Sequence, residues 1–188
     1  MPRVGDLALA SELTRKRGEG DGTMTPSLAI RPATSADRKR LRDAIVELQN
    51  FERALHPSRL PGEEVADAYL DWMLARSEQS GGVLIAEDAG CFLGFVAGWI
   101  EEHANIAETP ASKRFGYISD ICVVPAFRGR RVAERLLEAI ELHLKLAGVE
   151  YLRLDVLAAN GSARTSYERA GFVPYEVRYE KRLNTVLG

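Results

Sequence analysis

The stretch that decides the fold is Ile118-Ser-Asp-Ile-Cys-Val-Val-Pro-Ala-Phe-Arg-Gly-Arg-Arg-Val-Ala133. It begins as an apolar strand, is interrupted by Pro125 and leads into a segment whose apolar residues recur at helical spacing. A strand that ends in a short loop and opens a helix directs several backbone N–H groups at one place, near the positive end of the helix dipole. Arg128, Arg130 and Arg131 add charge there. The pattern is compatible with an anion site suited to a diphosphate, but these residues alone are explained as well by arginines on the solvated face of a surface helix.

The apolar pattern around this stretch predicts one α/β domain over residues 27–188 with a mixed sheet. Its second helix is expected to bury Tyr69 and Trp72. Residues 1–26 are charged and Gly-rich and predict a flexible N-terminal tail. The expected order of elements is strand 27–33, helices 35–55 and 63–77, strands 83–87, 91–101 and 116–124, helix 130–147, strand 151–157, helix 162–170 and strand 175–183.

Composition excludes several classes of protein. The 188 residues are 46% apolar and 28% charged, and the net charge is −2. Wholesale disorder and a strongly basic nucleic-acid binder are therefore excluded. Cys91 and Cys122 lie in apolar runs with no Cys-x-x-Cys pair, so we expect buried, reduced thiols and no metal site. No apolar run is long enough to span a bilayer and no secretory signal is visible, so we expect a cytoplasmic protein without membrane contact.

A second motif strengthens the evidence that the first binds a cofactor. The segment Asn160-Gly-Ser-Ala-Arg-Thr-Ser-Tyr-Glu-Arg-Ala-Gly-Phe172 and the stretch from Arg128 to Ala133 together resemble the GNAT N-acetyltransferase superfamily. The resemblance implies a centrally splayed mixed sheet flanked by helices. Arg128 and Ala133 fill the first and last positions of the superfamily's (Gln/Arg)-x-x-Gly-x-(Gly/Ala) signature. Arg131 replaces its glycine, and we expect tolerance because a residue in the first helical turn has negative φ.

The resemblance also implies an activity and a set of site residues. The activity is transfer of an acetyl group from acetyl-CoA, as co-substrate, to a primary amine of a small molecule by direct attack. The backbone of Cys122, Val123 and Val124 would pair with the pantetheine arm. Asn160 would bind the cofactor and Tyr167 would act as the acid at the sulfur. The pyrophosphate would be held by Arg128, Gly129, Arg130, Arg131, Val132 and Ala133.

The base is assigned from strand geometry. Asp120 lies two residues from Cys122, so both side chains fall on the same side of the strand. An aliphatic amine is almost entirely protonated at neutral pH, so some group must take its proton. Asp120 could do this directly or through water, or it could only orient the ammonium or pair with an arginine; both interpretations stay open. Glu101 and Glu102 are weaker candidates.

Two other functions stay open at this point. A catalytically silent CoA-binding sensor would keep the fold, and the acceptor could be a protein or peptide amine rather than a small molecule. A nucleic-acid partner is disfavoured because Glu134, Glu138 and Glu141 dilute the basic helix face. Homodimers are common in the superfamily, and the sequence fixes no interface.

Overall fold

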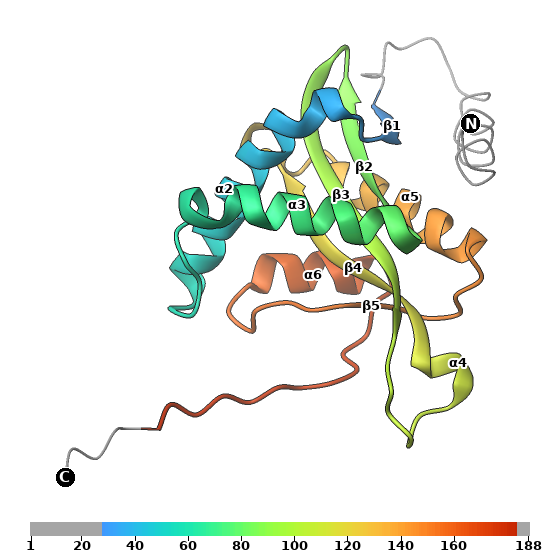
Figure 1. The fold of residues 1–188 in the computed structure, drawn as a ribbon. Helices are drawn as coiled ribbons and strands as arrows, with labels where there is room; N and C mark the ends of the chain where they lie inside the picture. The colour runs from blue at the N-terminus through green and yellow to red at the C-terminus, as the bar shows by residue number, and fades with distance from the viewer. Residues whose placement is uncertain (1–27, 184–188) are drawn as a thin grey trace.

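The computed structural model describes residues 28–183, which form one mixed sheet flanked by helices (Figure 1). The strand order is β1-β2-β3-β4-β5, antiparallel except for the parallel pair β4 and β5. The strands are β1 (Ala29–Pro32), β2 (Gly81–Asp88), β3 (Cys91–Glu102), β4 (Arg114–Val123) and β5 (Leu152–Leu154). The helices are η1 (Ser35–Asp37), α2 (Arg38–Leu55), α3 (Gly62–Ser80), α4 (Pro110–Lys113), η2 (Pro125–Phe127), α5 (Val132–Leu146) and α6 (Gly161–Arg169).

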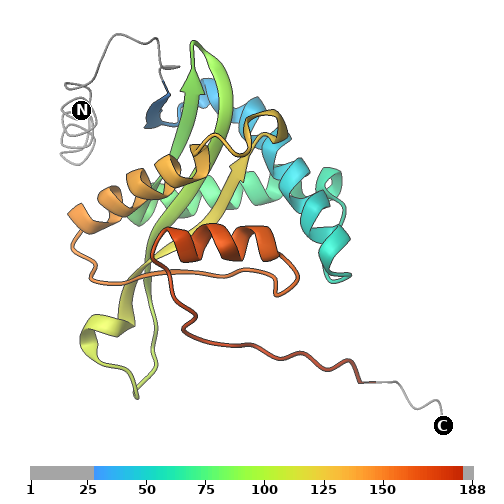
Figure 2. The same cartoon turned by 180° about the vertical axis from the view of Figure 1, so that it is seen from behind.

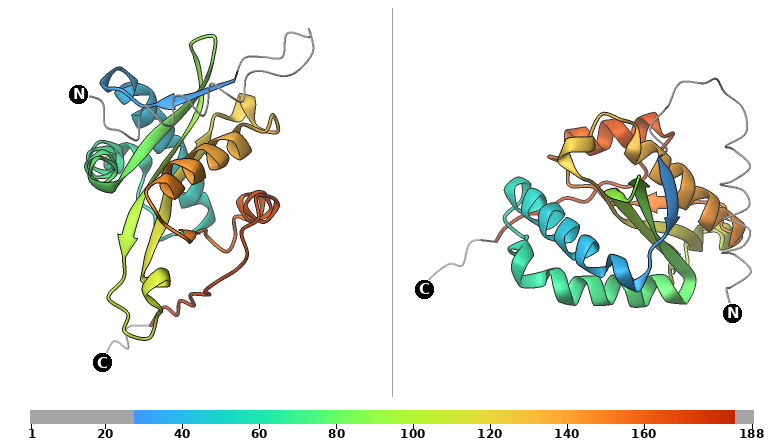
Figure 3. Two further views of the ribbon diagram at one scale, coloured as in Figure 1. Left: turned by 90° about the vertical axis from the view of Figure 1, so that its right-hand side faces the viewer. Right: turned by 90° about the horizontal axis from the view of Figure 1, so that it is seen from above.

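Helices cover both faces of the sheet (Figure 3). Helices α2 and α3 pack on one face, over a cluster that includes Leu70, Phe95 and Trp99. Helix α5 packs on the other face through the apolar stripe expected from its periodicity, with Leu136 and Ile140 fully buried. Each such side chain contributes roughly 1.5–3 kcal/mol by leaving water. The two clusters fix β4, the strand between them that carries most of the candidate site.

The sheet opens on one side of β4, as the resemblance implied. Strand β5 pairs with β4 only from Gly116 to Ile118. Beyond Ile118, no described strand pairs with that edge of β4, while the other edge stays paired with β3 as far as Val123. Helix α6 follows β5 and lies across the same side of the molecule as α5 (Figure 2). The part of β4 from Ser119 to Val123 therefore presents backbone groups to an opening rather than to a neighbouring strand.

Three expectations are corrected by the structure. The strand predicted at 175–183 is absent: the segment is extended but pairs with no described strand, and Tyr179 is 91% exposed. Alternating sequence predicts an extended conformation and cannot say whether a partner strand is present. Cys91 is exposed, whereas Cys122 is buried as expected, and both are free thiols. Trp72 is 47% exposed, since the buried side of α3 runs through Ala66, Leu70 and Met73 instead.

Two further expectations, the flexible N-terminal tail and the absence of a membrane-spanning segment, are tested only within the described residues or not at all. The predicted tail, residues 1–26, lies outside the described residues. Across residues 28–183, no helix has both the length and the apolar character needed to cross a bilayer.

Candidate active site

A β-bulge in β4 sets the direction of Asp120. Ile118 pairs with Gly98 and Asp120 pairs with Ala97, so Ser119 is the extra residue. Side chains alternate across a strand, and an extra residue shifts that alternation. Ile118 consequently packs in the α5 cluster, whereas Asp120 reaches Tyr69 on α3 and Cys122 reaches the Ala44 carbonyl on α2. The expected common side for Asp120 and Cys122 is confirmed.

Asp120 is a buried carboxylate held by neutral groups. Its side chain accepts hydrogen bonds from the Tyr69 hydroxyl, at 3.0 and 2.9 Å to its two oxygens, and from the Ser119 hydroxyl at 2.6 Å. The residue is 7% exposed, and no ion pair to it occurs among residues 28–183. Burial raises the pKa of Asp120, and the two hydroxyl hydrogen bonds oppose that rise. The arginine partner considered from the sequence is therefore not found in this part of the chain.

Tyr69 is a candidate site residue that its sequence pattern does not reveal, because helical spacing predicts only a buried position for it. Burial and the neighbouring charge of Asp120 raise the pKa of its phenol, so the hydroxyl remains a donor at every ordinary pH. A tyrosine on the inner side of a helix must find a partner for its hydroxyl. That requirement was visible in the sequence, but the partner on β4 was not.

Tyr167 extends from α6 toward the same region. Its ring packs against the α5 cluster and lies edge-on to Phe172, with centroids 6.2 Å apart. Burial raises the pKa of Tyr167 to about 12, and the negative charges of Glu52 and Asp120 add to this rise. Its hydroxyl forms no hydrogen bond with another described residue. The structure thus brings Tyr167 within electrostatic reach of Asp120 and leaves its proton available.

The open edge of β4 has one suitable backbone donor among the three residues predicted to contact the pantetheine. Val124 donates its N–H to the Leu93 carbonyl and accepts from the Phe127 N–H, both at 2.9 Å. Because peptide groups alternate between the two edges of a strand, Cys122 also faces β3, where it is paired with Phe95. The N–H of Val123 points to the open edge. Of the three residues, only Val123 therefore has a backbone N–H placed to contact the pantetheine arm.

The loop between β4 and α5 gathers exposed arginines in front of the helix. Arg128 donates to the Val123 carbonyl at 3.1 Å and to Glu47 at 2.8 Å, which fastens the loop to β4 and α2. Arg131 pairs with Glu134 at 2.7 Å, and the Arg130 guanidinium lies 5.5 Å from the centre of the Phe127 ring.

The first turn of α5 has no side-chain cap. The leading N–H groups of any helix, here those of Val132 and Ala133 among them, have no intrahelical acceptor, and at α5 no capping side chain takes its place. The expectation for Arg131 is wrong: its φ is +61°, in the left-handed region, and Gly129 beside it has φ +76°. The chain needs this left-handed turn to enter α5, and glycine adopts that conformation most easily, so the glycine of the signature has a conformational reason.

The remaining candidates lie apart or are already engaged. The Asn160 side chain caps α6 by accepting the Ala163 N–H at 3.1 Å, which leaves only its amide N–H₂ for a ligand. Glu101 is bound by Arg76 and by the Trp99 indole N–H, and it pairs with Phe115 toward the other end of β4. Glu102 is exposed. No metal-holding group of His, Cys, Asp and Glu side chains occurs within residues 28–183.

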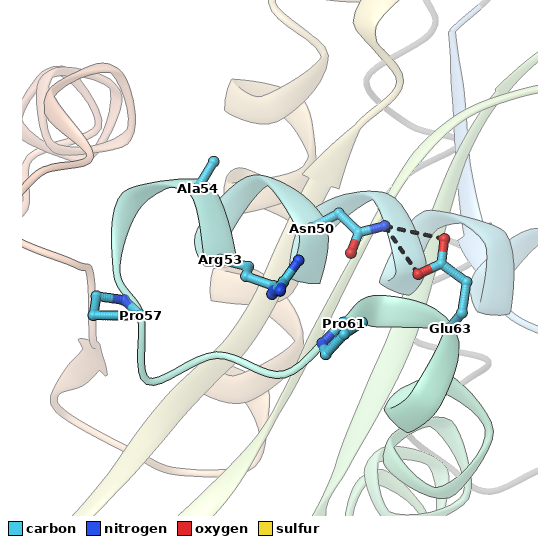
Figure 4. Close-up of a pocket in the computed structure, with 6 residues that line it drawn as sticks. All are labelled: Asn50, Arg53, Ala54, Pro57, Pro61 and Glu63. Atoms are coloured by element: carbon cyan, nitrogen blue, oxygen red, sulfur yellow. Dashed lines mark hydrogen bonds between the residues drawn. The ribbon is translucent and has the colours of Figure 1, made fainter.

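A hollow of about 580 Å³ lies at the turn between α2 and α3 (Figure 4). Asn50 bridges the turn, accepting the Gly62 N–H at 2.8 Å and donating to the Glu63 carboxylate at 3.2 Å. These bonds hold the ends of α2 and α3 together. The hollow is lined by Asn50, Arg53, Ala54, Pro57, Pro61 and Glu63.

Comparison with known proteins places this geometry in a family. Residues 45–172 match the acetyltransferase (GNAT) family. The chain belongs to that family. It is 33% identical over 88 residues to the uncharacterized N-acetyltransferase YycN of Bacillus subtilis, a match covering 47% of this chain and 54% of that protein. It is 32% identical over 131 residues to the mycothiol acetyltransferase of Propionibacterium freudenreichii, covering 69% of this chain and 39% of that protein.

Each of these two matches thus spans about half of the curated relative's length or less. Among solved structures, the aminoglycoside N-acetyltransferase AAC(6')-Iy in complex with CoA superposes with a TM-score of 0.63 at 20% identity, covering 87% of this chain and all of that one. At that identity the likeness shows a shared fold. The family and fold expected from the two sequence motifs are therefore confirmed.

Proposed function

We propose that this protein is an acetyl-CoA-dependent N-acetyltransferase that acetylates a primary amine of a small molecule by direct attack. The observation that carries the proposal is Asp120. It is a buried carboxylate with no ion pair among the described residues, and it lies on β4, whose edge away from β3 is unpaired beyond Ile118. A base of this kind is expected where a proton must be removed at neutral pH. The family assignment supports acetyl-CoA as the co-substrate.

The residues present fit the co-substrate. The uncapped start of α5 and the exposed guanidinium groups of Arg128, Arg130 and Arg131 form an anion site for the diphosphate. The Arg131–Glu134 pair is exposed and therefore weak, so a phosphate can replace the carboxylate. Bound acetyl-CoA would supply an acetyl thioester at the opening beside β4. Asn160 and the Val123 N–H would complete its binding at the splayed edge.

Two side chains of the protein carry out the proton transfers. Asp120 accepts the proton of the incoming ammonium at its carboxylate, directly or through water, while Tyr69 and Ser119 hold it in place. The Val123 N–H donates to the carbonyl oxygen as negative charge develops there. As the C–N bond forms and the C–S bond breaks, Tyr167, whose raised pKa of about 12 keeps it protonated, would donate its hydroxyl proton to the departing thiolate and regain a proton from the nitrogen of the new amide. Holding the two reactants side by side contributes up to roughly 7–11 kcal/mol in favourable systems.

The acceptor region is bounded by α2, α3 and β4. Glu52 and Arg59 are close enough to Asp120 to influence its pKa in opposite directions, and Glu52 pairs with Arg59 at 2.9 Å. These groups and the turn between α2 and α3 are the elements that would select the amine. The free thiols of Cys91 and Cys122 support a reducing compartment, and we place the reaction in the cytoplasm.

The test combines binding and turnover. Calorimetry with acetyl-CoA should show micromolar binding, and a panel of primary amines should contain members that release CoA. Tyr167→Phe should lower kcat on the order of 10²-fold with little change in acetyl-CoA affinity, as expected for a general acid. Tyr151→Phe removes a hydroxyl from a surface tyrosine outside the site and serves as the matched control. Binding without turnover across the panel would instead identify a CoA-binding sensor, and an unchanged rate in Tyr167→Phe would remove its acid role.

A further inference from the structure

The end of α2 carries a carboxylate on the side of the helix that faces the sheet. Ala44, Leu48 and Glu52 recur at intervals of four along α2 and therefore lie on one side of it. The Ala44 carbonyl meets the Cys122 thiol of β4, and Leu48 packs against the apolar cluster beneath the helix. Glu52 continues this row one turn further. Its side chain is 27% exposed, so most of it is covered by protein.

Glu52 lies close to both groups that are proposed to transfer protons. Burial raises the pKa of Asp120 and of Tyr167, and the negative charge of Glu52 adds to both of these rises. Coulomb interactions weaken with distance, so a carboxylate that acts on both groups lies near both. Removal of one proton from the acceptor needs one base, and Asp120 is the buried group suited to that step. The proton transfers proposed above therefore leave Glu52 without a role.

The protein itself supplies a cation to Glu52. Arg59, in the turn that follows α2, places its Nε 2.9 Å from Oε2 of Glu52. Among residues 28–183, neither member of this pair has a second ion-pair partner. The Arg59 side chain is 42% exposed, and an ion pair with this exposure contributes little to stability. The guanidinium of Arg59 is thus held beside the candidate site by a contact that another cation can replace.

The turn between α2 and α3 has other bonds that keep its shape. Asn50 accepts the N–H of the first residue of α3 at 2.8 Å, and Gln49 donates from its side chain to the Leu60 carbonyl at 3.2 Å. Both bonds tie the turn back to α2, and neither involves Arg59. The Arg59 side chain can consequently leave Glu52 while the backbone of the turn stays in place.

The charges beside the base match an acceptor that carries two ammonium groups. Asp120 and Glu52 are two carboxylates, and the one guanidinium that acts on Asp120, that of Arg59, is on a displaceable side chain. A monoamine brings a positive charge for Asp120 alone. An amine with a carboxylate of its own would add a third negative charge to this region. A diamine brings one ammonium for each carboxylate, and Arg59 then turns into solvent.

We propose, on the basis of the function proposed above, that Glu52 determines acceptor specificity by binding the distal ammonium of a diamine, and that Arg59 is an internal cation that competes for Glu52. The reacting amine of the diamine lies at Asp120. Without acceptor, the Arg59 guanidinium occupies the position of the distal ammonium. Glu52 is a positioning residue in this scheme, because it holds the acceptor by the end that does not react.

The test measures the ratio of kcat/KM for a diamine to kcat/KM for the monoamine of the same chain length. The linear diamines of propane, butane and pentane serve as probes, with the full chain and saturating acetyl-CoA. Both members of each couple use Asp120 and Tyr167, so effects on those two groups cancel in the ratio. The wild type should prefer its best diamine by about ten-fold or more, as expected for one charge-assisted hydrogen bond.

The decisive result is an opposite effect of the two halves of the ion pair. Glu52→Gln should lower the ratio toward unity, because the amide carries no charge. Arg59→Gln removes the competing cation and should raise the ratio about two- to five-fold, through a lower KM for the diamine. Both substitutions break the same ion pair, so a purely structural consequence of its loss would move the ratio in one direction. Arg53→Gln is the matched control, since Arg53 lines the hollow at the turn, and it should leave the ratio unchanged (Figure 4).

Three results overturn the proposal and leave the proposed function intact. The first is a wild type that acetylates amines without preferring any diamine. The second is a ratio that moves in the same direction in Glu52→Gln and Arg59→Gln. The third is a preference for amines that carry a carboxylate, lost in Arg59→Gln, which would make Arg59 an anion-binding residue. A protein that acetylates no amine contradicts the proposed function itself, and the role of Glu52 with it.

Discussion

Two buried aspartates in this molecule sit in opposite electrostatic settings. Asp37, in η1, is 2% exposed, and Asp120, on β4, is 7% exposed. Asp37 accepts from the Arg31 guanidinium at 2.8 and 2.9 Å and from the Thr34 N–H at 2.8 Å. Asp120 accepts only from the neutral hydroxyls of Tyr69 and Ser119. The burial is similar, and the difference lies in the donors.

The donors decide the direction of each pKa. The Arg31 guanidinium, aided by Thr34, holds the pKa of Asp37 well below its ordinary value despite burial. At Asp120 burial dominates and raises the pKa, since no cation compensates for lost hydration. A carboxylate paired with a cation ties β1, η1 and β2 together through Arg31 and Glu87. A buried carboxylate that lacks a cation partner is less stable in its charged form, so it binds a proton more readily, as a general base must.

The largest expected effect is that of Asp120→Asn on turnover. The amide has the same shape and can still accept from Tyr69, but it cannot accept a proton. The rate should fall on the order of 10²-fold or more, whereas acetyl-CoA affinity should be unchanged. Initial rates and calorimetry on the same preparation measure both. A variant as active as the wild type would place the base elsewhere.

The same substitution should raise stability at neutral pH. Because the pKa of Asp120 is raised in the folded state, its contribution is fully present below the ordinary aspartate pKa and is lost as pH rises through the raised value. The amide does not titrate. The Tm advantage of Asp120→Asn should thus grow across that window and be absent at the acidic end. A variant less stable at neutral pH would contradict the assignment of an unfavourable buried charge.

Asp37→Asn should have the opposite effect on stability. Loss of a buried, charge-assisted pair should cost about 2–3 kcal/mol. For a chain of this size that lowers Tm by roughly 4–12 °C. The lowered pKa of Asp37 gives stability that is present above the ordinary aspartate pKa and lost as pH falls toward the folded value, so the deficit should shrink in acid. Turnover measured below the melting transition should be retained. Equal Tm changes for Asp37→Asn and Asp120→Asn would contradict the opposite electrostatic settings of the two aspartates.

Tyr69→Phe should change the pH dependence more than the maximal rate. The Tyr69 hydroxyl stabilises the charged form of Asp120, so its removal raises that pKa further and moves the acid limb of the pH–rate profile to higher pH. One lost hydrogen bond of about 1 kcal/mol corresponds to about five-fold on that limb, with KM little changed. Tyr117→Phe is the matched control, because that hydroxyl donates to Asp155 at 3.1 Å rather than to Asp120. A uniform loss of rate at every pH would indicate a merely structural role for Tyr69.

The comparison also shows how far sequence reasoning reaches. Local periodicity predicted α5, since Leu136, Ile140 and Leu144 lie on one face whatever that face packs against. Strand spacing likewise predicted that Asp120 and Cys122 share a side. The difference between Asp37 and Asp120 could not be predicted, because Arg31 and Tyr69 reach their partners through the folded chain. The strand predicted at 175–183 was wrong for a related reason: the alternation of apolar and charged residues is present in the sequence, but no described strand pairs with the segment.

Arg131 shows that a shift of one residue at a helix start changes the backbone rule that applies. The sequence predicts a place in the first helical turn, but Arg131 is the residue before the helix and adopts φ +61°. That conformation costs an L-residue about 1–2 kcal/mol, and part of this is offset because glycine has more freedom to lose on folding. Arg131→Gly should therefore stabilise the protein by about 0.5–1 kcal/mol, the smallest effect predicted.

Arg130→Gly is the matched control for this substitution. Among the described non-glycine residues only Ala89 and Arg131 have positive φ, so glycine at position 130 relieves nothing and should lower stability slightly. Denaturant midpoints of the two variants should consequently move in opposite directions from the wild type. If both fell, the Arg131–Glu134 pair would outweigh the backbone strain. The arginine at the signature's glycine position would then be supported by its side chain rather than tolerated in spite of it.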